Sequence, residues 1–521
     1  MKLRNIFLLT VFNFICLPVF SQDSGGKELR ILHWNDLHAR NQMQKGSKKD
    51  SVTGERTEYI YGGTSNMLGY INKYRDDKSL VLNAGDDYQG TPISTLTRGN
   101  SQIELLNLFG LDAFVIGNHE FDYGQFTLDS GLSKAKFDYL SANVYLKPMK
   151  KTMGKPFTIK NINGIKTGII GITAPDLLTL TLPSNMTEIK MLDVDSVVTS
   201  AIETLKKEEC DLIILLTHVG VEYDKELASK FHKDVDVIIG GHSHTPLFKP
   251  VIQDGVIIAQ AGSYSRWLGK LELKVDTEKD TVLSYRGELT ETVLDSAVYD
   301  RSAQAEDDRM LETIGPELKK VIGRLEVDWT RSYSSESNLG QWEADAIRKK
   351  LNTDIAFMNA GGLRKDLLKG DITVGDVWEI NPFGNTIVTF SVKGSTLKQM
   401  MKNMLGNYLK ELKESGGSDM IVASGIRVEY DSKKAYAGED DFVLSVKVGD
   451  AEAEDDKIYS IATNNYVGTQ FKKYFGTVNE DFIIKDSNII DRDLIIEAVT
   501  EQKVISQPLE GRIVDITGDI K

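Results

Sequence analysis

Between residue 30 and about residue 273, short apolar runs alternate with longer segments of helical pattern. The runs cover residues 30–34, 79–83, 113–116, 167–172, 211–216, 235–239 and 256–260. This alternation is typical of strands joined by helical crossovers, and it predicts an α/β domain. In open α/β sheets ligands bind beyond the carboxyl ends of the strands. The polar residues that follow each run are therefore candidates for a functional site.

A second domain is expected in the C-terminal half, because 521 residues exceed what one hydrophobic core normally holds. From Ala303 to Leu325 the sequence is charged and favours a helix, which predicts an inter-domain helix. Beyond it, helical patterns and short apolar runs indicate another α/β or α+β domain. The expected helices cover 339–351 and 397–412, and the expected strands cover 355–358, 386–392, 427–430, 442–448 and 458–463.

The first residues have the layout of a secretory signal peptide. Lys2 and Arg4 precede an apolar stretch at 6–20, followed by a short polar segment at 21–23. The apolar stretch is shorter than the ~20 residues that a spanning helix needs. We therefore expect export to the periplasm or the medium, cleavage near residue 22 and no stable membrane anchor. The mature chain would keep Cys210 as its one cysteine and form no internal disulfide.

The charge balance excludes one class of partner. The formal net charge is −14, which repels phosphate backbones at long range. Nucleic-acid polymers are therefore not expected as partners. Small anions are still compatible with the chain, because a few arginines or bound cations set the local field.

The histidines point to a metal centre in the first domain. All seven lie at or before residue 244, and five of them follow the end of a predicted strand. One such string alone is an ordinary turn or cap, but several in one domain favour metal binding. The strings are Asn35-Asp36-Leu37-His38, Gly85-Asp86-Asp87-Tyr88-Gln89-Gly90, Gly117-Asn118-His119-Glu120-Phe121-Asp122, Thr217-His218-Val219-Gly220 and Gly240-Gly241-His242-Ser243-His244-Thr245.

Phosphate ester hydrolysis explains these residue types. Negative charge develops on the phosphoryl group, and two cations about 3.5–4 Å apart can stabilise both the attacking and the leaving oxygen. Holding two cations that close requires a bridging carboxylate. Mixed imidazole, carboxylate and amide ligands suit zinc, manganese or iron in the divalent state. We therefore expect two divalent metal ions as cofactors.

The five strings, in this order, resemble those of calcineurin-like metallophosphoesterases, and their detail resembles the 5'-nucleotidase family. The resemblance implies a four-layer α/β/β/α N-terminal domain followed by a smaller α/β substrate-binding domain. It also implies a division of the chain into a signal peptide at 1–21, a metallophosphoesterase domain at 27–298, a linker helix at 299–331 and a C-terminal domain at 332–521.

The family pattern assigns a role to each residue of the strings. One ion would be bound by Asp36, His38 and His244, and the other by Asn118, His218 and His242, with Asp86 as the bridge between them. His119, oriented by Asp122, would form the catalytic dyad and stabilise charge on the phosphoryl group or the leaving oxygen. The alternative for His119 is a further metal ligand. Asp87, Glu120 and His33 are interpreted as supporting residues, and His232 as a surface residue.

In the C-terminal half, the string Met358-Asn359-Ala360-Gly361-Gly362-Leu363-Arg364 resembles part of the family's substrate-binding domain. A glycine pair after a strand exposes backbone N–H groups to an anion, and an arginine beside it can bind a phosphate through two hydrogen bonds. We therefore predict Arg364 as a substrate-binding residue, with Asn359 and Asn385 as further candidates. A structural turn with a solvated arginine is the alternative.

The sequence departs from the family where the nucleobase is bound. Family members clamp the base between two aromatic side chains, but Met420 stands about where the first is expected, and the glycine-rich string of the second is missing. Stacking is worth about 1–3 kcal/mol per base. Tyr466, Phe471, Tyr474 and Phe475 are candidates for a replacement clamp or, alternatively, core residues.

We expect an exported, metal-dependent phosphoester hydrolase whose substrate is a small phosphate ester, most consistent with a nucleotide. Alternatives on the same metal pair are a 2',3'-cyclic nucleotide phosphodiesterase with 3'-nucleotidase activity, a nucleotide-sugar hydrolase and a thiosulfohydrolase. Alternatives from other classes are a non-catalytic binding protein for phosphorylated ligands and a structural surface protein. The sequence leaves open the metal in use, the exact substrate and the oligomeric state.

Overall fold

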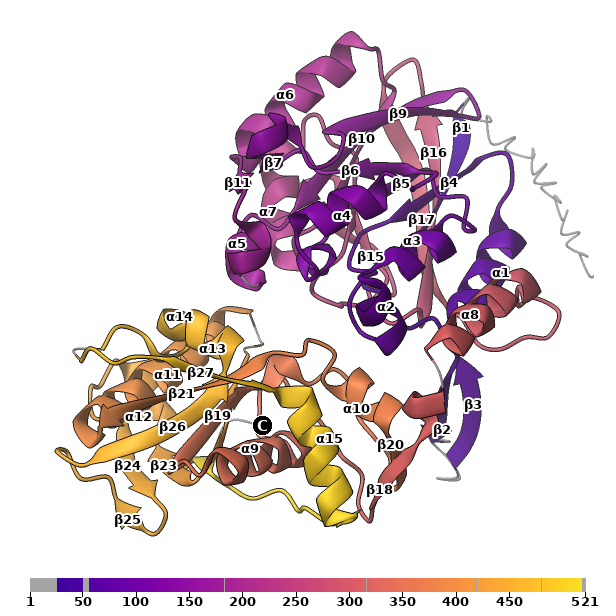
Figure 1. Cartoon of the computed structure of the whole chain (residues 1–521). Helices are drawn as coiled ribbons and strands as arrows, with labels where there is room; N and C mark the ends of the chain where they lie inside the picture. Colours follow the sequence, from indigo (N-terminus) through magenta and orange to yellow (C-terminus); the bar gives the residue numbers. More distant parts are fainter. Residues whose placement is uncertain are drawn as a thin grey trace, which may run out of the picture.

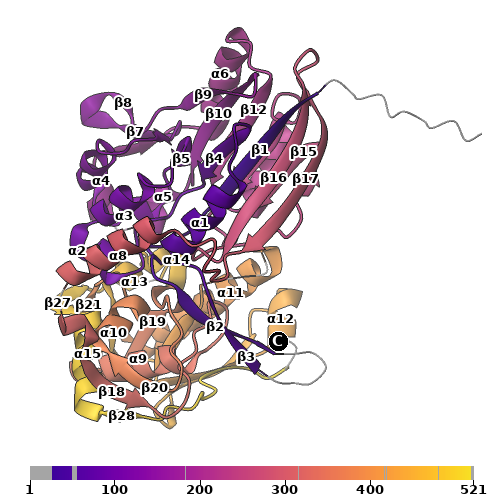
Figure 2. The same ribbon diagram turned by 90° about the vertical axis from the view of Figure 1, so that its right-hand side faces the viewer.

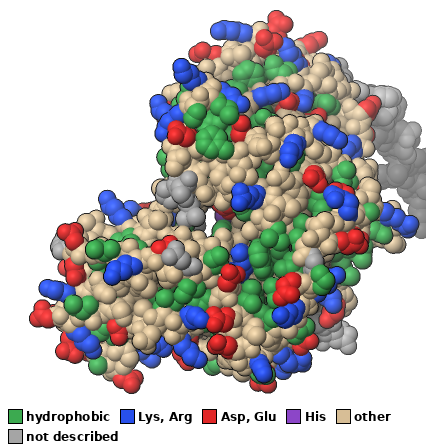
Figure 3. All heavy atoms as spheres, in the orientation of Figure 1, with side chains coloured by type: hydrophobic (Ala, Val, Ile, Leu, Met, Phe, Trp, Pro, Cys, Tyr) green, Lys and Arg blue, Asp and Glu red, His purple; other side chains and the backbone are tan. Residues whose placement is uncertain are grey.

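The computed structural model describes residues 26–517 except 50–55, 182, 315, 416, 418 and 479. The predicted signal peptide lies outside the described residues. Within them the chain forms an N-terminal and a C-terminal domain, and an opening between the two is visible in the space-filling view (Figure 3). No helix of the described part is both long and apolar enough to cross a membrane.

The N-terminal domain is built on two six-stranded sheets (Figure 1). The first has the order β17-β16-β1-β4-β5-β6 and the second β14-β15-β13-β12-β10-β9. The first sheet contains β1 (Lys27–Trp34), β4 (Ser79–Asn83), β5 (Ala113–Val115), β6 (Asp138–Leu140), β16 (Trp267–Asp276) and β17 (Thr281–Glu291). The second contains β9 (Phe157–Ile162), β10 (Ile165–Thr173), β12 (Leu212–His218), β13 (Val237–Gly240), β14 (Val251–Gln253) and β15 (Val256–Gln260).

Apolar side chains from both sheets form one core between them, including Leu82, Val115, Ile214 and Leu216. The outer face of the first sheet is covered by α1 (Thr64–Tyr74), α3 (Asn100–Leu106) and α4 (Gln125–Leu132), and that of the second by α6 (Val194–Lys207) and α7 (Val221–Phe231). The central strands are parallel and buried on both faces, which explains their continuous apolar runs. The predicted four-layer α/β/β/α fold is confirmed (Figure 2).

The C-terminal domain has a five-stranded sheet of order β22-β19-β26-β21-β27. These strands are β19 (Ile355–Asn359), β21 (Thr386–Lys393), β22 (Ile421–Ser424), β26 (Ile458–Asn464) and β27 (Lys485–Ile490). Helices α9 (Asn338–Leu351) and α15 (Asp491–Gln502) pack on one face, and α11 (Gly394–Ser415) packs on the other. Two smaller sheets flank it, of order β25-β24-β23-β29 and β20-β18-β28. Their strands are β18 (Val321–Leu325), β20 (Gly370–Thr373), β23 (Ile426–Tyr430), β24 (Val443–Val448), β25 (Ala451–Glu452), β28 (Val504–Ile505) and β29 (Ile513–Asp515). This confirms the expected α/β domain.

The predicted inter-domain helix at 303–325 is wrong in its second half. Helix α8 covers Arg301–Thr313, a 3-10 turn follows at Pro316–Lys319, and Val321–Leu325 forms strand β18. Pro316 has no backbone N–H to donate and cannot continue a helix. Strand β18 pairs with β20 (Gly370–Thr373) and β28 (Val504–Ile505), so it belongs to the C-terminal domain.

Gly69 in α1 lies where the segment just before α8 packs against the N-terminal domain. A Cβ atom on Gly69 would lie 2.2 Å from the backbone oxygen of Val298. We predict that Gly69→Ala lowers the free energy of unfolding by about 1–3 kcal/mol, because backbone atoms must shift to admit the methyl group. Urea unfolding measures this.

Gly406→Ala is the matched control, because this glycine is also helical and its Cβ would lie 3.9 Å from its nearest neighbour, Cζ of Phe442. The control should be neutral or stabilising by up to about 1 kcal/mol. Equal effects of the two substitutions would contradict the packing assigned to Gly69.

Candidate metal centre

The predicted metal ligands converge at the carboxyl ends of the parallel strands. Loops after β1, β4, β5 and β13 carry them, together with the last residue of β12. Six of them form two groups of three. Within each group, the candidate ligand atoms lie within 4.8 Å of one another. The groups are Asp36 with His38 and His244, and Asp86 with His218 and His242.

The two carboxylates lie between the histidines of both groups. Oδ2 of Asp86 is 3.0 Å from Nε2 of His218 and 3.9 Å from Nε2 of His38. Oδ1 of Asp36 is 3.1 Å from Nε2 of His244 and 3.9 Å from Nε2 of His218. Each of the two carboxylates therefore lies within 3.9 Å of histidines from both groups.

Several of these residues have a strained backbone. Asp36, His38, Asp86, His242 and His244 have φ angles of 51°, 52°, 60°, 79° and 54°. This left-handed region is unfavourable for residues other than glycine, and such strain clusters at functional sites, where the surrounding structure maintains it. The loops are thus held in a conformation that aims their side chains at one point.

Unpartnered polar atoms in the centre fit a pair of cations. Oδ1 of Asn118 is buried and has no hydrogen-bond partner in the described part of the chain. Oδ1 of Asp36 and Nε2 of His218, also buried, lie close to charged neighbours without forming a hydrogen bond to any described residue. Such atoms are costly unless a ligand satisfies them. The other ring nitrogen of His218 bonds to the carbonyl of Ala84 at 2.6 Å, which turns Nε2 toward the centre. The donor set of imidazole, carboxylate and amide fits divalent zinc, manganese or iron.

Glu120 supports the two loops that carry Asp86 and Asn118. Its carboxylate accepts hydrogen bonds from the backbone N–H groups of Asp86 (3.0 Å), Asp87 (2.7 Å), Tyr88 (3.2 Å) and Gly117 (2.7 Å). Burial, followed by the charge of Asp86, raises the pKa of Glu120 to about 7. One buried carboxyl group thus fixes the spacing of two ligand-bearing loops.

His119 and Asp122 form a hydrogen-bonded pair beside the centre. Nδ1 of His119 is 2.7 Å from Oδ2 of Asp122, and the ring lies 5.2 Å from the ring of His38. Burial lowers the pKa of His119, but the charges of Asp122 and Asp86 outweigh it and raise the pKa above its usual value. Because Nδ1 is engaged, Nε2 is the ring nitrogen left for a substrate. His119 is a member of neither metal-ligand group in the described residues.

Of the predicted substrate residues, Arg364 lies at the metal centre. Its Nη2 is 3.3 Å from Nε2 of His38, and the side chain is largely buried. Asn359 and Asn385 instead bond within the C-terminal domain. The Oδ1 of Asn359 accepts a hydrogen bond from Asn464 at 3.0 Å, and the backbone oxygen of Asn385 accepts one from Asp491 at 2.8 Å.

Two further residues at the centre were not predicted. Arg40 forms an ion pair with Glu379 of the other domain and donates to the backbone oxygen of Arg364 at 3.1 Å. The ring of Tyr264 lies 5.4 Å from the ring of His244, and its hydroxyl is buried without a hydrogen-bond partner in the described residues. Arg40 could have been predicted from the sequence, because it lies two residues after the predicted ligand His38. No local sequence pattern pointed to Tyr264.

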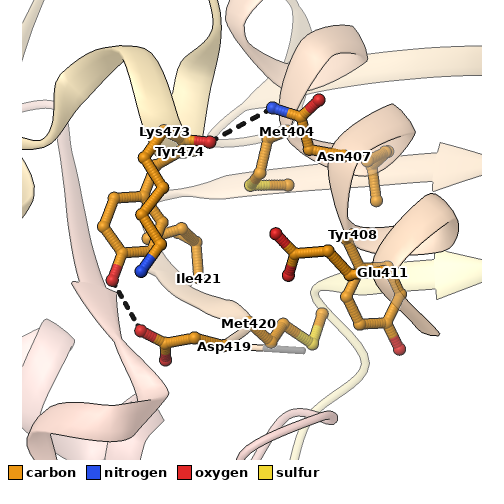
Figure 4. A pocket seen from close by; sticks show the side chains of 10 residues that line it. Met404, Asn407, Tyr408, Glu411, Asp419, Met420, Ile421, Lys473 and Tyr474 are labelled. Atoms are coloured by element: carbon orange, nitrogen blue, oxygen red, sulfur yellow. Dashed lines mark hydrogen bonds between the residues drawn. The ribbon is translucent and has the colours of Figure 1, made fainter. Parts of the chain in front are cut away.

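The candidate clamp aromatics are mostly core residues. Phe471 and Phe475 pack in the core beside α11, and Tyr474, which is also buried, donates its hydroxyl to Oδ2 of Asp419 at 2.5 Å (Figure 4). Met420 is buried next to them. Tyr466 differs, because its hydroxyl lies 3.5 Å from the backbone oxygen of Thr179 in the N-terminal domain.

Comparison with known families divides the chain as the fold does. Residues 29–246 match the calcineurin-like phosphoesterase family, and residues 321–478 match the C-terminal domain of 5'-nucleotidases. The solved 5'-nucleotidase precursor of Thermus thermophilus superposes with a TM-score of 0.82 at 28% identity, covering 93% of this chain and 99% of that one.

Among curated proteins, the chain is 28% identical to the 5'-nucleotidase of Rattus norvegicus over 535 residues, which is 93% of this chain and 90% of that protein. It is 27% identical to endonuclease YhcR of Bacillus subtilis (strain 168) over 467 residues. This match covers 85% of the chain but spans 37% of the length of that relative.

The role of Glu120 gives a test of the centre. We predict that Glu120→Gln weakens divalent metal binding about 10- to 100-fold, because the amide turns an N–H donor toward backbone N–H groups. Isothermal titration of manganese into chelator-treated protein measures the affinity. Glu222→Gln is the control, since Glu222 is 71% exposed on α7. Unchanged affinity in Glu120→Gln would show that the loops hold their spacing without it.

Proposed function

Since the chain belongs to the 5'-nucleotidase family, with a calcineurin-like phosphoesterase domain and a 5'-nucleotidase C-terminal domain, we propose that it hydrolyses nucleotides and releases phosphate. The observation that carries this proposal is the meeting of two His/Asp groups with His119 of one domain and Arg364 of the other. Hydrolysis of a phosphoester needs cationic charge around the phosphoryl group, a proton donor beside the leaving oxygen and a side chain that binds the anion.

The proposed ligand sets are those of the family pattern, with Asn118 completing the group of His218 and His242. Two divalent ions bound there would supply the positive charge that neutralises the phosphoryl oxygens and activates the attacking water. Arg364 would bind a phosphoryl oxygen through its guanidinium group. His119, held by Asp122 at 2.7 Å, would keep Nε2 on the phosphoryl or leaving oxygen.

The C-terminal domain would bind the organic half of the substrate. Contacts that cross the domains, Arg364 with His38 and Arg40 with Glu379, support a site that both domains complete. The burial of Met420, Tyr474 and Phe475 favours a leaving group that is not held by two stacked aromatics. Cyclic nucleotides and nucleotide sugars, whose phosphoesters the same metal pair could cleave, are the second class of substrate.

We also propose that the chain is exported, on the layout of its first residues, and that its domains divide near 298 and 331 except for β18, which joins the C-terminal domain.

The test is phosphate release from AMP, UDP-glucose, cyclic nucleotides and bis(p-nitrophenyl) phosphate in the presence of manganese or zinc. We predict turnover of at least one nucleotide and a fall in kcat of about 10²–10⁴-fold in His119→Ala, because its ring supplies proton transfer or charge stabilisation. His232→Ala is the matched control, since His232 is exposed. Absence of turnover on every substrate would favour a non-catalytic binding protein. Equal rates in His119→Ala and His232→Ala would show that His119 takes no part in catalysis.

A further inference from the structure

Two carboxyl groups are buried beside the side chain of Asn381 in the C-terminal domain, apart from the metal centre. Glu343 on α9 is 2% exposed and Asp491, the first residue of α15, is fully buried. Glu343 accepts a hydrogen bond from Nδ2 of Asn381 at 3.1 Å. The backbone N–H of Asp491 donates to the oxygen of Asn385 at 2.8 Å. The two residues therefore hold the two ends of the turn 381–385.

This turn contacts the catalytic machinery. The ring of Phe383 lies 5.8 Å from the ring of His119 and 5.9 Å from the guanidinium carbon of Arg364. The residue before the turn, Ile380, accepts the backbone N–H of Arg364 at 2.8 Å. A displacement of the turn would therefore move Phe383 and Arg364 relative to His119.

The hydrogen bonding around the two acids is incomplete. Oδ2 of Asp491 and Oδ1 of Asn381 are buried without a partner in the described residues. Two negative charges at this site would repel each other in apolar surroundings. Burial, and next the charge of Asp491, raises the pKa of Glu343 to about 8, while burial raises the pKa of Asp491 to about 6.

Arg492 on α15 partly compensates the charge of Asp491, and its backbone N–H donates to Oδ1 of Asp491 at 2.7 Å. Its guanidinium carbon lies 3.6 Å from the centre of the Trp378 ring, and the guanidinium group donates to the oxygen of Pro382. The end of α10 (Val374–Ile380) leads to the neutral Asn381. The strands beneath α9 and α15 present apolar side chains, which are Ala356, Met358, Ile387 and Ala462.

We propose that Glu343, in its protonated form, and Asp491 act as positioning residues that hold the turn 381–385, and with it Phe383 and Arg364, at the metal centre. A proton kept on Glu343 leaves one negative charge at this site instead of two. The effect on catalysis rests on the proposed function, whereas the effect on stability does not.

The sign of the pH dependence follows from linkage. The folded state keeps a proton on Glu343 from its ordinary pKa of 4.5 up to about 8, where the unfolded chain has lost it. Stability therefore falls as pH rises through this window and has lost this contribution above it.

The experiment compares the full-length wild type with Glu343→Gln, Glu343→Ala and, as a control on the same helix pair, Glu497→Gln, whose carboxylate forms an exposed ion pair with Lys350. Glutamine keeps a donor and an acceptor but has no charge to develop. We expect the unfolding midpoint of the wild type to fall more steeply from pH 6 to 9 than that of Glu343→Gln, whose kcat should stay within about twofold of the wild type at pH 7. We expect Glu343→Ala to lose about tenfold or more in kcat, since misplaced groups lose rate steeply.

The proposal is overturned if wild type and Glu343→Gln have parallel unfolding profiles across this pH range, or if alanine and glutamine variants keep the same kcat. If the wild type releases no phosphate from any substrate, the proposed function fails, and the unfolding profiles alone decide whether Glu343 keeps its proton in the folded state. Glu497→Gln should match the wild type in both measurements.

Discussion

Asp36 and Asp86 are buried in the same space as four histidines, and this concentration of ligand atoms governs the rest of the N-terminal domain. Uncompensated charge is expensive in a protein interior, and a buried polar atom without a partner adds to that cost. The left-handed backbone at the ligand loops carries a further cost. A pair of divalent cations would offset both, which makes metal binding the interaction on which the site depends.

The fold makes the convergence possible. Parallel strands of both sheets end at one edge, so loops from distant parts of the sequence meet there. Glu120 ties the Asp86 loop to the Asn118 loop, and Gly117 leaves room, since a Cβ atom at this position would lie 2.2 Å from Oδ1 of Asp86. The C-terminal domain then adds Arg364 and, through the turn 381–385, Phe383.

Much of this could be predicted from the sequence. Strands buried on both faces appear as continuous apolar runs, and the polar strings after 30–34, 79–83 and 211–216 marked the ligand loops. The features that the sequence did not predict are set by contacts between distant segments of the chain. Strand β18 is short and lies in charged sequence, and its pairing with residues 370–373 and 504–505 decided its conformation over local helix propensity. Tyr264 and Glu343 acquire their surroundings from segments far away in the chain, so no local pattern pointed to them.

The most direct test of metal binding at this centre is anomalous diffraction from crystals of the protein grown with manganese. We expect two peaks per chain, about 3.5–4 Å apart, one within reach of Asp36, His38 and His244 and the other of Asn118, His218 and His242, with Asp86 between them. A single peak, or density at neither group, would contradict a dinuclear centre.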